Sequence, residues 1–247
     1  MKKILLIGES CRDIFVYCKA NRLCPDIPVP ALSIVNQTEN PGMAKNVERN
    51  ILSIYPHCRM FTNKGWENVT KTRYMHLESN HMFIRVDTDH NIKRIDVKKV
   101  PLADYDIVAI SDYNKGFLKE VDIEYICKNN KNVFIDTKKI LGNWALKAKC
   151  IKINNYEYEH SKDTMPRALM GKLIYTKGEE GAYFNGKNYP VKNKVEVKDT
   201  SGAGDSFFAA LLVKYAETGE IEKSIEFANV CASKVVSQKG VTVIERP

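Results

Sequence analysis

Short apolar runs recur along the chain, and stretches with a helical spacing of apolar positions lie between them. The runs that favour strands are Ile4–Ile7, Ile107–Ile110, Val133–Ile135, Cys150–Ile153 and Leu173–Thr176. Continuous apolar runs of this kind are typical of strands buried on both faces of a parallel sheet. The stretches that predict helices are Gly42–Ile54, Glu120–Asn129, Tyr156–Met170, Gly202–Ala216 and Glu222–Ser237. The alternation predicts an α/β fold with right-handed crossovers, whose ligands bind at the carboxyl ends of the strands.

Two segments break this alternation. Residues 14–40 contain three prolines and then the β-prone run Ala31–Val35, and residues 71–87 read as two short strands. Neither segment has a helical period, so we expect antiparallel strands that form a lid within about 14–40 and 71–87. No repeat, low-complexity tract or linker interrupts the chain, which predicts one domain over residues 1–247 that includes this lid.

The net charge of the chain and its distribution limit the classes of binding partner but do not identify one. The chain has 38 basic and 30 acidic residues, a net charge of +8, and the basic residues are mixed with acids along its length. Proteins that bind nucleic acid usually carry blocks of like charge, so a nucleic-acid partner is the least supported. A positive field also concentrates anionic small molecules, and an ordinary solvated basic surface stays open as well.

The spacing of the cysteines and the short lengths of the apolar stretches indicate a cytoplasmic protein with no membrane partner. The seven cysteines include no C-x-x-C pair, which predicts reduced thiols rather than a disulfide framework or a zinc site. The apolar stretch Phe207–Val213 is far shorter than the roughly 20 residues that span a bilayer. The first apolar run ends at Gly8, too early for a signal peptide.

The strongest chemical signal is the string Asp-Thr-Ser-Gly-Ala-Gly-Asp-Ser-Phe-Phe at 199–208, which precedes an apolar helical run. Closely spaced glycines at a helix start expose backbone N–H groups, and together with the helix dipole these bind an anion. Asp205 lies at the edge of that site, where a carboxylate can accept a proton from a hydroxyl that attacks a phosphate. The plainer alternative is that Asp205 only complements the helix dipole and the glycines only form a turn.

The wider string Asp-Thr-x-Gly-Ala-Gly-Asp-x-Phe resembles the C-terminal signature of the ribokinase-like (PfkB) carbohydrate kinases. In that family the Gly-Ala-Gly turn is the anion hole and the following Asp is the catalytic base. The resemblance implies these roles for Gly202, Ala203, Gly204 and Asp205. It also implies a three-layer αβα sandwich with a small β lid. The cofactors it implies are ATP and Mg²⁺, and it leaves a monovalent cation open.

The resemblance extends along nearly the whole chain and is closest to the kinase domain of the heptose-7-phosphate kinases. Pro41–Val47 is similar to the first family signature. The stretch Ile7-Gly8-Glu9 followed by Asp13 resembles the family's first strand, which ends in a sugar-binding Asp. The implied substrate-binding residues are Asp13, Gly42, Asn46, Lys71, Arg73, Arg85, Asp112 and Lys115. The basic ones could bind a phosphate carried by the substrate, or could simply be surface charge.

The nucleotide side is implied by weaker motifs in matching places. Asn154-Asn155-Tyr156-Glu157 is similar to the family's Asn-x-x-Glu, which organises Mg²⁺, often through water, and the ATP phosphates. Thr176–Gly181 resembles the nucleotide loop, and Asn229 lies where the adenine-side helix of the family runs. The resemblance thus implies ATP contacts by Asn154, Glu157, Thr176, Lys177, Gly178 and Asn229, with Asn154 and Glu157 also at the metal.

Two departures from the family pattern bear on the acceptor site. Met43 stands where the family usually has a glycine that lets backbone approach a ligand closely. Only Pro56–Thr70 fills a region where the family has a strand, a loop and a helix, so about one strand–helix unit is expected to be missing.

Together these features predict an ATP-dependent carbohydrate kinase that phosphorylates a hydroxyl of a small sugar, with a sugar phosphate resembling heptose-7-phosphate as the preferred acceptor. A kinase of a neutral sugar or nucleoside is one alternative, and a catalytically silent ligand-binding member of the fold is another. Exposed strand edges in the lid need pairing or cover, which predicts a homodimer through the lid.

Overall fold

The computed structural model describes residues 1–246 except 80, 89–91, 193–194 and 239. Its main sheet has eight strands in the order β12-β11-β10-β9-β8-β7-β1-β4. The strands from β10 to β4 pair in parallel, and β11 and β12 add an antiparallel hairpin at the far edge. The bounds are β1 Ile4–Gly8, β4 Cys58–Phe61, β7 Ile107–Asp112, β8 Val133–Thr137, β9 Cys150–Asn154, β10 Leu173–Thr176, β11 Ala182–Phe184 and β12 Lys187–Tyr189. All of the apolar runs that predicted strands lie in this sheet.

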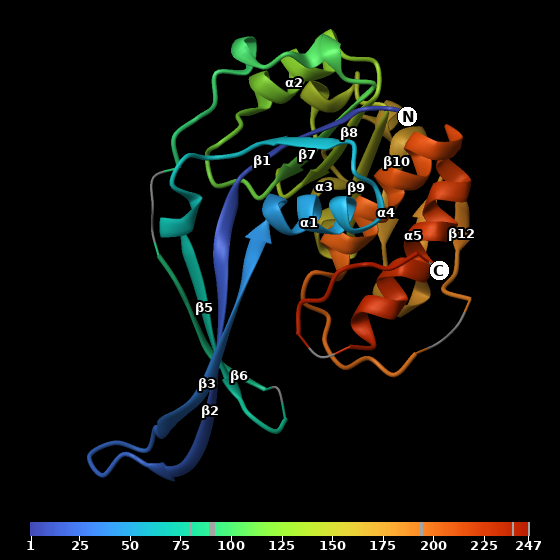
Figure 1. The fold of residues 1–247 in the computed structure, drawn as a ribbon. Coiled ribbons are helices and arrows are strands. Elements are labelled where there is room, and N and C mark those ends of the chain that lie inside the picture. Colours follow the sequence, from blue (N-terminus) through green and yellow to red (C-terminus); the bar gives the residue numbers. More distant parts are fainter. Residues whose placement is uncertain (80, 89–91, 193–194, 239, 247) are drawn as a thin grey trace.

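Helices cover both faces of the sheet (Figure 1). Alternate residues of each strand point to opposite faces, so Ile4 and Leu6 join one apolar core while Leu5 and Ile7 join the other. The first core packs against α1 (Ala44–Ile54), α4 (Ala203–Thr218) and α5 (Ile221–Val236). The second packs against α2 (Glu120–Asn129), α3 (Asn155–Ser161) and the short 3₁₀ turns near them. The predicted α/β sandwich of three layers is confirmed.

A second sheet of four strands, in the order β3-β2-β5-β6, projects from the body of the molecule (Figure 1). Its strands are β2 (Ser10–Leu23), β3 (Pro30–Met43), β5 (Thr70–His76) and β6 (Met82–Asp87). Both segments in which the sequence predicts lid strands contribute strands to this sheet, and β2 and β3 form a longer hairpin than the sequence indicated. Pro25 and Pro28 lie in the connecting turn, and Pro30 is the first residue of its strand, a position that tolerates a missing N–H.

Several predicted helices differ from the observed ones at their ends, and two of these differences have a clear cause. The stretch Tyr156–Met170 was too long, because α3 ends at Ser161 and a 3₁₀ helix occupies Arg167–Lys172. Pro166 lacks an N–H and disfavours a helical conformation of the residue before it, so the α-helix cannot continue through this point. Helix α1 begins two residues later than predicted, because Gly42 and Met43 still pair with β2 in the lid.

The shortened middle of the chain keeps its strand. β4 pairs in parallel with β1, so the expectation that a whole strand–helix unit is missing was wrong for the strand. Residues 62–69, all of which the structure describes, contain only the 3₁₀ turn Trp66–Asn68 between β4 and β5. The missing part is thus the helix, and β4 is left as the edge of the main sheet.

No cysteine is bonded to another in the structure, and all seven are free thiols. Among the described residues, no helix combines the length and the apolar character that crossing a membrane requires.

Candidate active site

The start of α4 forms an anion-binding turn. Gly202, the residue before the helix, has a φ of 79°, a left-handed conformation that glycine adopts without strain. A Cβ at this position would also meet Asn46 Nδ2 at 2.9 Å. Ala203 N donates to Thr200 O, and Ser206 N donates to Gly202 O. The N–H groups of Gly204 and Asp205 between them are the ones that the helix start offers to an anion.

The carboxylate of Asp205 is held from two sides at this turn. Asn46 Nδ2 donates to Oδ2 at 2.9 Å, and the Tyr113 hydroxyl donates to Oδ1 at 2.6 Å. The side chain is buried, with 7% of the residue exposed. Burial raises the pKa of Asp205, while the hydrogen bonds from Asn46 and Tyr113 and the nearby ammonium groups of Lys152 and Lys138 oppose that rise. A raised pKa makes the carboxylate a better proton acceptor, provided that the opposing groups keep it ionised.

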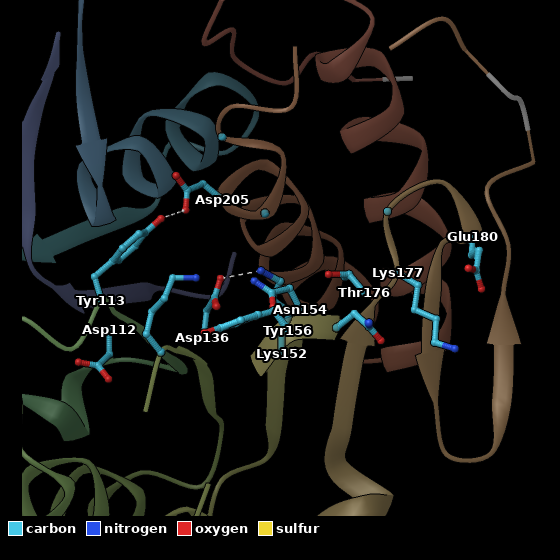
Figure 2. Close-up of a pocket in the computed structure, with 15 residues that line it drawn as sticks. Asp112, Tyr113, Asp136, Lys152, Asn154, Tyr156, Thr176, Lys177, Glu180 and Asp205 are labelled. Carbon is cyan, nitrogen blue, oxygen red and sulfur yellow. Dashed lines mark hydrogen bonds and ion pairs between the residues drawn. The ribbon is translucent and has the colours of Figure 1, made fainter. Parts of the chain in front are cut away.

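A polar pocket of about 590 Å³ opens beside Asp205, between the carboxyl ends of β7 to β10 and the start of α4 (Figure 2). We call it the nucleotide-side pocket. Lys152 Nζ donates to Asp136 Oδ2 at 2.9 Å inside it, and a Cβ on Gly204 would lie 3.1 Å from that ammonium. A glycine at 204 therefore lets the buried cation approach the anion-binding turn closely. The predicted ATP residues that line this pocket are Asn154, Thr176, Lys177 and Gly178.

Asn154 and Glu157 form a capping box at the start of α3. Glu157 N donates to Asn154 Oδ1 at 2.9 Å, and Asn154 N donates to Glu157 Oε2 at 2.8 Å. The other carboxylate oxygen of Glu157 accepts from Asn154 Nδ2 and pairs with the ammonium of Lys138. Glu157 is buried behind the pocket wall, and it acts on the pocket through Asn154 and Lys138, which line it.

A smaller and more apolar pocket of about 220 Å³ adjoins the nucleotide-side pocket. It lies between α4, α5 and the segment before α4, and Thr176, Gly178 and Gly204 belong to both pockets. Asn229, predicted on the adenine side, lines it and donates from Nδ2 to Tyr189 O at 2.8 Å. The position of Asn229 is thus set by a structural hydrogen bond within the wall of this apolar slot.

A third pocket of about 290 Å³ lies on the other side of Asp205, between the lid and the body. We call it the acceptor-side pocket. It shares Tyr113, Gly202 and Asp205 with the nucleotide-side pocket, so the carboxylate stands where the two meet. The predicted substrate residues that line it are Asp13, Gly42, Asn46, Lys71 and Arg73.

The charges in the acceptor-side pocket are partly neutralised. Arg73 Nε and Nη2 donate to the two oxygens of Asp13 at 2.9 and 3.1 Å, a bidentate ion pair. The ammonium of Lys71 lies 5.0 Å from the centre of the Tyr113 ring, and burial lowers its pKa. Lys71 makes no ion pair among the described residues, and the nearby carboxylates of Asp13 and Asp87 only oppose the effect of burial on its pKa. Its ammonium can therefore still bind an anionic ligand.

The remaining predicted substrate residues lie outside this pocket. Arg85 is half-exposed on β6 and pairs with Asp87. Lys115 has an exposed side chain, and its backbone N–H donates to Glu9 Oε1 at 2.7 Å. Asp112 is buried at the edge of the nucleotide-side pocket, where its carboxylate accepts from Thr137 Oγ1 and Lys139 Nζ. The predicted gathering of basic residues around Asp13 therefore involves Lys71 and Arg73 but neither Arg85 nor Lys115.

Sequence reasoning did not single out Tyr113, Asp136, Lys138 or Lys152. Asp136 and Lys138 lie at the end of the apolar run of β8, and Asn154 lies at the end of β9. This shared position at strand ends could have identified Asp136 and Lys138 as site residues. Lys152 was visible as a charged residue within a run that otherwise reads as a buried strand. Tyr113 lies in the stretch Ser111–Gly116, which carries part of the family resemblance, but no local signal marks its contact with Asp205, 92 residues away along the chain.

Known proteins are similar to this chain both in sequence and in fold. Residues 124–246 match the model of the pfkB family of carbohydrate kinases. The chain is 28% identical to the bifunctional protein HldE of Helicobacter pylori (strain Shi470), in a match that covers 97% of this chain and 64% of that protein. The chain thus spans less than two thirds of the length of this curated relative.

Solved structures share the fold at lower identity. The structure of ribokinase from Thermotoga maritima superposes with a TM-score of 0.75 and 16% identity, covering 98% of this chain and 95% of that one. Ribokinase from Arabidopsis thaliana, solved with ribose and ATP, gives a TM-score of 0.69 and 14% identity, covering 97% and 94%. The resemblance that the motifs indicated is confirmed: the chain has the ribokinase fold, and its C-terminal half, residues 124–246, matches the pfkB family of carbohydrate kinases.

Proposed function

We propose that the protein is an ATP-dependent kinase that transfers the γ-phosphoryl group of ATP to a hydroxyl of a sugar, with a sugar phosphate as the preferred acceptor. The observation that carries the proposal is the position of Asp205, at the junction of two pockets and at the start of α4. A base in that position can reach an acceptor hydroxyl on one side and a phosphoryl group on the other.

The nucleotide-side pocket has the chemistry that a triphosphate needs. Two lysines, Lys138 and Lys152, and the first N–H groups of α4 surround its inner end. The adjoining apolar slot beside Asn229 suits an adenine ring, because a purine buries a flat, weakly polar surface. Positioning and charge neutralisation supply most of the catalysis of phosphoryl transfer, so this set of groups is sufficient for the reaction.

The residues present fit a magnesium ion that arrives with ATP and keeps much of its water. Asp136 is the carboxylate beside Lys152 in the pocket, while Glu157 is committed to Asn154 and Lys138. The described part of the chain holds no group of three metal-ligating side chains, and an ion bound mainly by phosphates and water needs none. Asn154, which Glu157 orients from behind the pocket wall, would hold it through water, and Mg²⁺ would neutralise phosphate charge there. A monovalent cation stays a prediction.

The proposed transfer moves one phosphoryl group and one proton. The acceptor hydroxyl oxygen forms a bond to the γ-phosphorus while the bond from that phosphorus to the β,γ-bridging oxygen breaks, so that ADP leaves. The hydroxyl proton passes to the carboxylate of Asp205. Backbone N–H groups at 204–205 and the ammonium of Lys152 stabilise the charge on the transferring group.

The charge of Lys71 bears on the class of acceptor. Its unpaired ammonium beside Asp205 favours an acceptor that carries its own anionic group. The Arg73–Asp13 ion pair favours the alternative, a neutral sugar or nucleoside, because those two charges already satisfy one another.

The free thiols support a cytoplasmic protein.

Turnover measurements test the catalytic proposal. ATP hydrolysis and ADP formation would be followed with a panel of sugars, sugar phosphates and nucleosides, for the wild type and for Asp205→Asn. We expect Asp205→Asn to bind ATP normally and to lose about 10²–10⁴-fold in rate, the usual contribution of a positioned base. Glu217→Gln, on the same helix but outside the pockets, is the control. Equal rates in wild type and Asp205→Asn would exclude Asp205 as the base, and ATP binding without turnover of any acceptor would favour a silent ligand-binding protein.

Calorimetric titration tests the acceptor class. Loss of a charge-assisted hydrogen bond weakens binding by roughly 10–150-fold, so Lys71→Met should lose that much affinity for the sugar phosphate and little for its unphosphorylated parent. Arg85→Met is the matched control, since Arg85 lies outside the acceptor-side pocket. If the wild type binds both ligands equally well, the neutral acceptor is the correct one.

A further inference from the structure

Tyr113 occupies the wall between the two pockets. It lines both of them, and its hydroxyl points at Asp205 (Figure 2). The ammonium of Lys71, on the acceptor side, lies 5.0 Å from the centre of its ring. The ammonium of Lys138, on the nucleotide side, lies 5.4 Å from the same centre. One side chain therefore touches the candidate base and a cation from each pocket.

We propose that Tyr113 is a positioning residue that orients the carboxylate of Asp205 and keeps it ionised for proton transfer. The inference rests on the proposed kinase function, and it concerns how the base of that reaction is prepared. Asn46 holds one oxygen of the carboxylate and Tyr113 holds the other, so the carboxylate plane is fixed. Each carboxylate oxygen can accept more than one hydrogen bond, which leaves capacity for the proton of the acceptor hydroxyl.

The backbone around Tyr113 is firmly anchored. Asp112, the residue before it, ends β7 and accepts from Thr137 Oγ1 at 2.5 Å and from Lys139 Nζ at 3.0 Å. Both partners come from the end of β8 or the residues just after it. Tyr113 directly follows this anchored strand end, so its hydroxyl can hold a carboxylate in one orientation more closely than a residue farther into the loop could.

The electrostatics favour a tyrosine that donates and an aspartate that accepts. Asp205 faces Asn46 of α1, Tyr113 at the end of β7, Lys138 beyond β8 and Lys152 of β9, and all four lower its pKa against the effect of burial. Burial raises the pKa of Tyr113 well above its ordinary value, and the nearby carboxylates of Asp205 and Asp136 and the thiol of Cys11 raise it further. The phenol therefore keeps its proton across the working pH range and remains a donor to Asp205.

The test is Tyr113→Phe, read first in the ligand-free protein. Titration of the Asp205 carboxyl carbon by NMR, with the signal assigned from its loss in Asp205→Asn, should show the pKa of Asp205 about one unit higher in Tyr113→Phe than in wild type. The sign follows from the hydrogen bond, which stabilises the ionised form and is lost in the variant. Tyr55→Phe is the matched control, because Tyr55 is a buried tyrosine whose hydroxyl, like that of Tyr113, donates one hydrogen bond, here to Lys2 O at 2.7 Å, outside the pockets.

Kinetics give the second readout. Once an acceptor is identified, the acid limb of the kcat/KM profile should move to higher pH by about as much as the pKa of Asp205 rises. The reason is that a larger share of Asp205 is protonated at any acidic pH. On the plateau kcat should fall about tenfold from loss of orientation, with both KM values within about twofold of wild type. The Tyr55→Phe profile should coincide with that of the wild type.

The outcomes separate this inference from the function on which it rests. An unchanged pKa of Asp205 in Tyr113→Phe, or raised KM values with kcat and the pH profile unchanged, would overturn the positioning role. If the wild type transferred phosphoryl to no acceptor, the kinase function would fail, while the NMR titration would still decide whether Tyr113 sets the ionisation of Asp205.

Discussion

Met43 has a backbone conformation that is unusual for its residue type. Its φ of 59° and ψ of −136° lie in a region that glycine enters freely and other residues enter at a cost of about 1–3 kcal/mol. The resemblance to carbohydrate kinases places a glycine here, and the chain keeps that backbone with a side chain that is 4% exposed and lines the acceptor-side pocket. The contacts of the buried side chain offset the strain.

This strain predicts an inverted order of stability between two substitutions. Met43→Ala keeps the strained backbone and loses the side-chain contacts, whereas Met43→Gly loses the contacts and relieves the strain. We therefore expect Met43→Gly to be more stable than Met43→Ala by about 1 kcal/mol in urea unfolding. At Leu52, exposed on α1, the usual order should hold, with Ala more stable than Gly by about the same amount. If Met43 followed the order seen at Leu52, its backbone would be unstrained.

At the scale of the element, the start of α3 joins a helix cap to a pocket lysine. Glu157 closes the capping box with Asn154 and also pairs with Lys138, which lines the nucleotide-side pocket. The cap and the ion pair can be separated, because Gln serves in a capping box as Glu does but carries no charge.

Glu157→Gln should therefore leave the helix intact and change the response to Mg²⁺. We expect a higher Mg²⁺ concentration for half-maximal activity, with a smaller change in the KM of the acceptor, because Lys138 loses its partner and competes with the cation for phosphate charge. Glu159→Gln, on the same short helix and paired with exposed Lys162, is the control. If the Mg²⁺ titrations of wild type and Glu157→Gln coincide, Asn154 and Glu157 act only as a helix cap.

At the scale of the whole molecule, the lid has two unlike faces. Asp13 pairs in register with Lys71, and Lys71 with Asp87, so the acceptor-side residues share one face of the sheet. Side chains alternate along a strand, so Ile84 and Val86 lie on the opposite face, and both are about half exposed. The sheet projects from the body (Figure 1), and the exposure of Ile84 and Val86 leaves this apolar face uncovered.

We expect this apolar face and the strand edges beside it to pair with a second copy of the chain, as exposed edges need cover. Light scattering during gel filtration should give the mass of a dimer at micromolar concentration, and Ile84→Lys combined with Val86→Lys should give a monomer. Val121→Lys, an exposed apolar position on α2, should leave the mass unchanged. A wild-type protein that is monomeric at tens of micromolar would contradict the lid-mediated dimer.

The sequence by itself determined the features that depend on neighbouring residues. Apolar runs predicted the strands of the parallel sheet, and Gly202–Asp205 at the head of an apolar helix predicted the anion-binding turn, because strand burial and helix starts depend on residues close together in the chain. The lid was recognised from prolines and β-prone residues, although its hairpin extends beyond the expected ends. Helix α3 was overextended because the helical pattern continued where Pro166 and the local turn ended it.

Only the tertiary structure decided which side chains meet at the site. Asp205 is held by Asn46 and Tyr113, which are 159 and 92 residues away, and strand order brings all three to one end of the sheet. Lys71 and Arg73 enter the acceptor-side pocket while Arg85 does not, although all three looked equally suited to phosphate. The physical reason is register: the distance of a side chain from the pocket depends on which strand carries it and what it pairs with across the sheet, and local sequence pattern specifies neither.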